Sequence, residues 1–145
     1  QDNESRSHKG VLRGLHFQLP PKAQSKLVRV IEGAVLDVAV DIRRGSPSFG
    51  QYVAVELSSI NKKQMFIPRG FAHGYVVLTE SATLVYKVDN YYSPKCDRGL
   101  VFDDIDLNID WQLNKQELLV SDKDTQQPRL TELKDFFDYD YNYYE

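Results

Sequence analysis

Between about Gly10 and Asn90 the sequence consists of short segments of alternating residue character, a pattern that indicates the fold class. β-Branched and aromatic residues alternate with polar ones, and Gly, Pro, Ser and Asn separate the segments, as is typical of strands joined by turns. The predicted strands are 11–17, 26–32, 35–42, 52–57, 64–67, 74–78 and 82–88. No helical period interrupts them. Seven short strands at this spacing predict an all-β jelly roll, built as a sandwich or a barrel.

The chain beyond residue 103 follows a different pattern. Residues 103–130 contain an Asp-rich turn and predict one short helix around 114–119. In residues 135–145 acids alternate with Phe and Tyr. We expect this tail either to dock on the barrel or to leave it, as a frayed segment or as one that contacts a partner. We assign it no function. A chain of 145 residues fits one core, so we expect one domain over 1–130 and an acidic aromatic tail over 131–145.

Charge and cysteine content exclude several classes of protein. A single cysteine, Cys96, cannot form an intrachain disulfide, and three histidines are too few for a zinc finger. No apolar run approaches the roughly 20 residues of a membrane span, and no secretory leader is recognisable. We therefore expect a cytoplasmic protein without a membrane partner. The isoelectric point of about 5.6 argues against nucleic-acid binding, although the basic first 30 residues suit a small anion such as a diphosphate.

Three ionisable side chains fall on strand faces that otherwise carry aliphatic residues. By alternation, Tyr86 and Lys26 lie on the apolar sides of their strands, and His16 is expected on the side of Leu12 and Gly14. If these strands line one cavity, a base, a cation and a phenol converge there. Each residue also has a structural interpretation: a packed Tyr ring, a His without a chemical role, and a Lys that reaches solvent at a strand end.

A short motif resembles the second motif of the cupin fold. The segment Ile67-Pro-Arg-Gly-Phe-Ala-His73 has the form Pro-x-Gly-x-x-His, in which Pro and Gly shape a turn and His begins a strand. Metal-binding cupins also carry His-x-His in their first motif, whereas the corresponding place here reads His16-Phe-Gln18. Two histidines without a third ligand would hold a transition metal weakly, so we expect no metal site.

Several further blocks make the resemblance more specific. They are Gln1-Asp-Asn-Glu-Ser-Arg-Ser, Gly10-Val-Leu-Arg-Gly-Leu-His-Phe-Gln18, Lys26-Leu-Val-Arg29, Asp37-Val-Ala-Val-Asp-Ile-Arg43, Tyr86-Lys, Asn90-Tyr-Tyr-Ser-Pro94 and Ser121-Asp-Lys-Asp124. In order and spacing, over roughly residues 1–130, the chain resembles the dTDP-4-dehydrorhamnose 3,5-epimerases, which are metal-free cupins of the L-rhamnose pathway. The resemblance implies a homodimeric jelly roll that needs no cofactor and acts on a dTDP-4-keto-6-deoxy sugar.

The resemblance also implies roles for individual residues. The family's base falls on His16, its carboxylate partner on Asp124, its enolate-stabilising cation on Lys26 and its acid on Tyr86. Substrate contacts fall on Gln1, Asp2, Asn3, Arg13, His73, Asp97 and Lys123, and the thymine platform on Tyr91 or Tyr92. A neutral imidazole is a competent base near pH 7, and a planar guanidinium such as that of Arg13 suits a diphosphate.

Members of that family carry further strands ahead of the Gln-Asp-Asn block, which stands at residues 1–3 of this sequence. We expect such strands to contribute to nucleotide affinity and dimer stability. The four proposed catalytic residues are all present in this sequence, so we expect proton transfer to depend on those strands less. Three alternatives stay open beside the 3,5-epimerase. They are an epimerase that inverts a single centre, a non-catalytic cupin that binds a sugar nucleotide, and a metal-dependent cupin.

Overall fold

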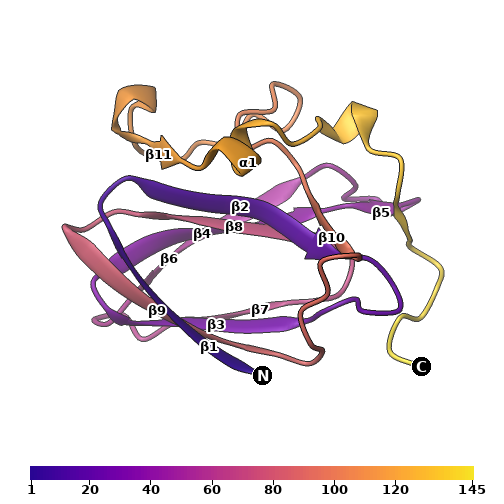
Figure 1. Ribbon diagram of the computed structural model, residues 1–145, viewed down its shortest axis with the longest axis horizontal. Coiled ribbons are helices and arrows are strands. Elements are labelled where there is room, and N and C mark those ends of the chain that lie inside the picture. The colour runs from indigo at the N-terminus through magenta and orange to yellow at the C-terminus, as the bar shows by residue number, and fades with distance from the viewer.

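The computed structural model describes residues 1–145 and consists mainly of two facing antiparallel sheets with a third layer on one of them (Figure 1). The first sheet has the strand order β1 (Asp2–His8), β9 (Ser81–Val88), β3 (Lys26–Glu32) and β7 (Gln64–Ile67). The second has the order β10 (Asp97–Gly99), β2 (Val11–Gln18), β8 (Phe71–Val77), β4 (Ala34–Asp41) and β6 (Tyr52–Ser58). The architecture is the predicted jelly roll.

Short elements complete the chain. The strand β11 (Leu119–Val120) pairs in parallel with β2, and β12 (Phe137–Asp138) pairs in parallel with β5 (Arg43–Arg44). The helical elements are single turns: η1 (Lys115–Glu117), α1 (Asp122–Thr125) and η2 (Leu130–Glu132). The predicted helix near 114–119 is thus one 3₁₀ turn. None of these helices has the length and apolar character that crossing a membrane requires.

All seven predicted strands are present, and alternation missed one long strand, β1, which faces a polar surface. The strand β8 begins at Phe71, three residues before the predicted start. The strand β1 was not predicted because its sequence, Asp-Asn-Glu-Ser-Arg-Ser-His, contains no apolar residue. It pairs with β9 over its full length, with Asn3 opposite Tyr86. Its inward side faces a polar hollow, so the usual apolar signal is missing.

Two hydrophobic cores hold the three layers together. One lies between the two sheets and includes Val28, Val35, Leu57 and Leu84. The other lies between the second sheet and the chain after residue 100, which covers the outer side of that sheet (Figure 1). Because β4 belongs to the middle layer, every one of its residues is buried. This double cover explains why segment 35–42 reads as an almost continuous apolar run.

A bulge in β2 changes which residues face the space between the sheets. The pairing of β2 with β8 shifts register between Arg13 and His16, and Gly14 in the bulge has φ +119°. As a result Leu12 joins the outer core, whereas Arg13 and His16 face inward. The expectation that His16 shares its side with Leu12 was wrong, because an extra residue in one strand reverses the alternation after it.

The acidic aromatic tail docks on the body of the protein. Phe137 is 1% exposed and belongs to the outer core together with Leu130 and Leu133. The Tyr143 ring meets the Phe137 ring edge to face, with 4.8 Å between centroids. Burying a phenyl ring of this size stabilises the docked tail by ~2 kcal/mol. Of the interpretations left open for this segment, the structure supports docking.

Gly14 offers a test of the bulge. A Cβ at this position would lie 2.5 Å from Gly74 Cα and 2.7 Å from the His73 carbonyl oxygen, so Gly14→Ala must push β2 and β8 apart. We expect a loss of about 3 kcal/mol in the free energy of unfolding. Gly45→Ala is the control, because φ there is also positive but the nearest atom to the new Cβ is 3.8 Å away. Its loss should be about 1 kcal/mol. Equal losses in urea denaturation would contradict this interpretation.

Candidate active site

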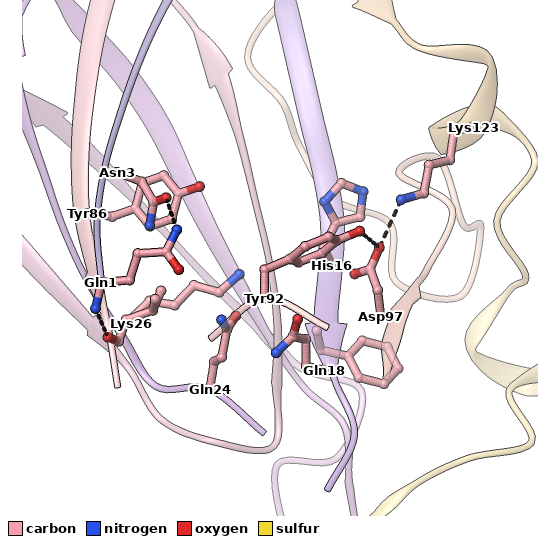
Figure 2. A pocket seen from close by; sticks show the side chains of 12 residues that line it. Gln1, Asn3, His16, Gln18, Gln24, Lys26, Tyr86, Tyr92, Asp97 and Lys123 are labelled. Carbon is pink, nitrogen blue, oxygen red and sulfur yellow. Dashed lines mark hydrogen bonds and ion pairs between the residues drawn. The ribbon is translucent and has the colours of Figure 1, made fainter. Parts of the chain in front are cut away.

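Two adjoining hollows open between the sheets, each with a volume of about 440 Å³, and they share His16, Lys26, Tyr86 and Lys123. We call the first the outer hollow; it is also lined by Gln1, Asn3, Phe17, Gln18, Gln24, Val88, Tyr92 and Asp97. We call the second the inner hollow; it is also lined by Ser5, Arg13, His73, Tyr75, Ser121 and Asp124. Most of these side chains are polar. Figure 2 shows the outer hollow, with side chains converging from β1, β2, β3 and β9.

His16 is paired with a buried carboxylate. Its Nε2 lies 2.5 Å from Asp124 Oδ1, and the other carboxylate oxygen accepts a hydrogen bond of 3.2 Å from the Gly14 amide. Burial by itself raises the pKa of Asp124, but the hydrogen bonds from His16 and Gly14 outweigh it and leave this pKa below its ordinary value. An ionised carboxylate only accepts hydrogen bonds. Nε2 of His16 therefore carries the proton, and Nδ1 is free to take another.

The C-terminal layer delivers Asp124 to the edge of β2. Ser121 caps α1 and its hydroxyl accepts a hydrogen bond from the Asp124 amide. Along the same edge, β11 pairs with Leu12 and β10 pairs with His16. The carboxylate fills the interval between these two short strands, where the Gly14 amide has no strand partner. The bulge thus exposes the amide that helps to hold Asp124.

Lys26 brings an unpaired ammonium into the hollow. It enters from the first residue of β3, and Figure 2 shows its amine directed to the middle of the space. Its ammonium forms no hydrogen bond or ion pair with another residue. Burial lowers its pKa to about 8, against a weaker opposite effect of Asp37 and Asp97. A fixed, poorly solvated cation of this kind is suited to stabilising a developing negative charge.

Tyr86 lies across the hollow from His16. The two side chains come from different sheets, and Figure 2 shows the Lys26 amine between them. Burial and the neighbouring Tyr75 phenol raise the pKa of Tyr86, while Arg13 acts in the opposite direction. The phenol is therefore protonated at neutral pH. The site presents a proton acceptor on one side and a proton donor on the other.

A second histidine–carboxylate pair lies beside the inner hollow, and its histidine, His73, lines that hollow. His73 Nε2 is 2.7 Å from Asp37 Oδ1, and both residues are buried. The other Asp37 oxygen has no hydrogen-bond partner. Sequence reasoning did not assign a role to Asp37, although an acid flanked by aliphatic residues inside segment 35–42 was a signal for it. The structure contains no group of three or more His, Cys, Asp or Glu side chains placed to hold a metal ion.

The predicted substrate contacts are not all brought together. Gln1, Asn3, Asp97 and Lys123 line the outer hollow, and Arg13 and His73 line the inner one. Asp2 lies on the opposite side of β1, where its carboxylate pairs with Lys87 at 2.6 Å.

In the lining of the outer hollow, Lys123 Nζ is 2.8 Å from Asp97 Oδ2, an ion pair that raises the pKa of Lys123. Of the two aromatic candidates, Tyr92 lines the outer hollow and its hydroxyl donates to Asp97 over 3.4 Å. Tyr91 is 72% exposed and does not line it.

Sequence reasoning missed further polar residues that line the hollows. Ser5 belongs to the strand that was not predicted, and Gln18, Gln24 and Ser121 carry no pattern that marks them. Tyr75 had a detectable signal, because it lies two residues after His73 and therefore on the same face of β8.

Comparison with known proteins identifies the family. Residues 1–132 match the family model described as dTDP-4-dehydrorhamnose 3,5-epimerase. The enzyme of that name from Shigella flexneri is 56% identical over 124 residues, which cover 86% of this chain and 67% of the relative. The one from Escherichia coli K12 is 53% identical over 133 residues, covering 92% of this chain and 71% of the relative.

Solved structures agree with the sequence comparison. A dTDP-6-deoxy-D-glucose-3,5-epimerase from Legionella pneumophila, in complex with dTDP-4-keto-L-rhamnose, superposes with a TM-score of 0.90 at 49% identity, covering 96% of this chain and 74% of that one. A 3′-monoepimerase from Streptomyces bikiniensis, in complex with dTDP-quinovose, superposes with a TM-score of 0.84 at 37% identity, covering 90% of this chain and 66% of that one. With an inward-facing histidine–aspartate pair, a half-buried lysine and an opposing phenol on this fold, the chain belongs to the dTDP-4-dehydrorhamnose 3,5-epimerase family.

Proposed function

We propose that the protein inverts C3 and C5 of dTDP-4-dehydro-6-deoxy-D-glucose and so forms dTDP-4-dehydro-L-rhamnose without a cofactor. One observation carries the proposal. The His16–Asp124 pair and the Tyr86 phenol face the same hollow from two sheets, with the Lys26 ammonium between them. A ketone at C4 acidifies the hydrogens at C3 and C5, so each inversion needs a base on one face and an acid on the other.

In the first step His16 takes a proton from the carbon next to the carbonyl. Its Nδ1 is the free nitrogen, because Nε2 donates to the Asp124 carboxylate. As the imidazole accepts the proton it becomes cationic, and the adjacent carboxylate stabilises this charge. The electrons of the broken C–H bond move to the C4 oxygen and form an enolate.

Lys26 then stabilises the enolate oxygen. Its ammonium has no other partner, so the C4 oxygen would be its first close anionic neighbour in the site. Donors of this kind contribute ~3 kcal/mol to the stability of an oxyanion-like transition state. His73, backed by Asp37, contacts the substrate in the same inner hollow.

Tyr86 returns a proton to the opposite face of the carbon, and the configuration is inverted. The phenol is protonated at neutral pH because its pKa is raised by burial and by Tyr75. Arg13 faces the inner hollow, and we keep it as the candidate for the diphosphate. Of the two tyrosines proposed as a platform for thymine, Tyr92 is the better candidate because it lines the outer hollow.

A single-centre epimerase is the second candidate function, since the fold and site geometry also fit the 3′-monoepimerase with a TM-score of 0.84. Incubation of the 4-keto sugar nucleotide in deuterated water, followed by proton NMR, separates these cases. We expect deuterium at both C3 and C5. Deuterium at one carbon would indicate the single-centre enzyme, and binding without any exchange would indicate a non-catalytic cupin.

The assembly of the protein is also a proposal. Leu27 and Phe66 are neighbours across β3 and β7, and together with Ile31 they expose apolar surface on the outer face of the first sheet. A second copy of the chain would cover this face in the expected homodimer. The cytoplasmic location and the absence of nucleic-acid and membrane partners stay predictions.

His16→Ala should abolish exchange at both carbons. Removal of the general base is expected to lower the exchange rate by ~10³-fold. The strand β1 ends at His8, an exposed histidine outside both hollows. His8→Ala is therefore the matched control and should exchange at the wild-type rate. NMR in deuterated water measures both variants. Near wild-type exchange in His16→Ala would assign the base to another residue.

Tyr86→Phe should separate proton removal from inversion. The substitution keeps the ring but removes the acid, so deuterium is expected to enter from the His16 side with the original configuration retained. Inversion should fall by ~10²-fold or more. The ratio of exchange to inversion, read from the same NMR spectra, checks this expectation. If Tyr86→Phe inverts both centres at the normal rate, the acid lies elsewhere.

Lys26→Met should stabilise the fold near pH 7. The pKa of Lys26 is about 8 in the folded protein and 10.5 ordinarily, so folding is less favourable when the amine is charged. Because solvent screens part of this effect, the charged ammonium lowers the free energy of unfolding by about 2 kcal/mol. Below pH 8 Lys26 carries its proton in both the folded and the unfolded chain, and the full loss of stability applies. Between pH 8 and 10.5 the unfolded chain holds more protons, so wild-type stability rises and the advantage of the variant fades.

Urea denaturation at several pH values measures this effect. The exposed residue Lys63 provides the control, because Lys63→Met should change stability little at any pH. A Lys26→Met protein less stable than wild type at pH 7 would show that the ammonium contributes to stability instead of lowering it.

A further inference from the structure

The C-terminal segment contacts the part of the fold from which Lys26 enters the hollow. This segment lies beyond the residues 1–132 that match the family model. Figure 1 shows it, in yellow, running past the ends of both sheets from β5 toward the level of β3. It ends at a group of four residues that we call the Tyr144 cluster: Ser25, Arg69, Asp89 and Tyr144.

Tyr144 makes three contacts within this cluster. Its hydroxyl accepts a hydrogen bond of 3.0 Å from the Arg69 amide and lies 2.9 Å from the Ser25 hydroxyl. Its ring lies under the Arg69 guanidinium, which is 4.9 Å from the ring centroid. The same guanidinium donates to the carbonyl oxygen of Tyr143. Tyr144 therefore joins the segment before β3 to the turn before β8.

Asp89 closes the cluster. One of its oxygens accepts a hydrogen bond of 2.7 Å from the Ser25 amide, and the other is 3.2 Å from Arg69 Nη2. The cluster thus connects the start of β3, the turn that leads into β8 and the end of β9. These are the strands that carry Lys26, His73 and Tyr86.

The end of the chain is held firmly enough to act as an anchor. Phe137 is buried, β12 pairs with β5, and the Tyr143 hydroxyl accepts a hydrogen bond of 2.6 Å from the Asp138 amide. Tyr144 directly follows Tyr143, so its position relative to the outer core is set by these contacts. A short, anchored strap of this kind can restrain the backbone that it touches.

Lys26 depends on such a restraint more than the other site residues do. His16 and His73 are each oriented by a carboxylate, but the Lys26 ammonium has no hydrogen bond or ion pair of its own. A poorly solvated ammonium gains free energy by moving toward water. The side chain is held only by its packing and by its backbone, which pairs with Ile67 and Val88 at the very start of β3 and continues from Ser25 in the Tyr144 cluster.

We propose that Tyr144 is a positioning residue for Lys26, acting through its hydrogen bond to Ser25 to keep the lysine backbone in place for catalysis. The catalytic part of this inference rests on the proposed function. The structural part, that Tyr144 restrains the backbone of Ser25 and Lys26, does not depend on it.

Tyr144→Phe tests the proposal, because it removes both hydrogen bonds of the hydroxyl and keeps the ring for Arg69. We expect kcat to fall about fivefold, with KM changed less than about twofold. Exchange at C3 and C5 should slow by the same factor, since both steps share the C4 oxygen that Lys26 stabilises. Tyr141→Phe is the matched control: its hydroxyl has no hydrogen bond, and wild-type kinetics are expected.

A double-mutant cycle tests whether Tyr144 acts on Lys26 through its hydrogen bond to Ser25. Ser25→Ala removes the other partner of the same hydrogen bond, so it should lower kcat to a similar extent. The Tyr144→Phe and Ser25→Ala double variant should then be no slower than the slower single variant. Unchanged kcat in Tyr144→Phe, or effects that multiply in the double variant, would overturn the proposal.

Amide hydrogen exchange provides a measurement that needs no activity. In Tyr144→Phe the Ser25 and Lys26 amides should exchange about tenfold faster than in wild type, while the amides of β4 stay protected. If the wild-type enzyme proves inactive, the proposed function fails but this result still tests the restraint. If the two amides exchange at wild-type rates, the restraint itself is refuted, whatever the activity.

Discussion

The hydrogen bond between His16 and Asp124 links the site to the rest of the fold. Its two residues are 108 positions apart in the chain, one on β2 and the other in the layer that covers the second sheet. The covering layer therefore has two roles. It buries the outer side of the second sheet, and it places a carboxylate at an interval on the edge of β2 where the Gly14 amide has no strand partner. The histidine–carboxylate pair therefore requires the C-terminal layer to be in place on β2.

The same bulge that frees this amide also turns His16 inward. Gly14 allows the close approach of β2 to Gly74 and reverses the alternation that follows it. Without the bulge, an imidazole at position 16 would point into the outer core among aliphatic side chains. Backbone geometry at one glycine thus decides whether the histidine is a structural residue or a base.

The hollow lowers the stability of the fold in exchange for reactivity. Lys26 carries an unpaired ammonium, and one Asp37 oxygen lacks a partner, so neither group is as well solvated as it would be in water. A core as apolar as the one on the other side of the second sheet would be more stable but could not stabilise an enolate. Proteins retain such groups where a charge develops during the reaction.

Strand alternation was enough to predict seven strands, the jelly roll and the inward direction of Lys26 and Tyr86. It was not enough for β1, whose inward residues meet a polar hollow, nor for His16, whose direction depends on a bulge that no local pattern marks. Asp124 came only from the family resemblance, because a contact across 108 residues leaves no periodic signal. The outward direction of Asp2 was implied by its position next to Asn3, but only once β1 was known to be a strand.

Nitrogen-15 NMR of His16 in the free enzyme shows which ring nitrogen carries the proton. If the Asp124 carboxylate fixes the imidazole as described, the neutral ring carries its proton on Nε2, and Nδ1 gives the chemical shift of an unprotonated nitrogen. Asp124→Asn should shift the ring toward a mixture of tautomers. A neutral His16 ring with its proton on Nδ1, or one whose tautomer does not respond to Asp124→Asn, would show that Asp124 does not orient the base.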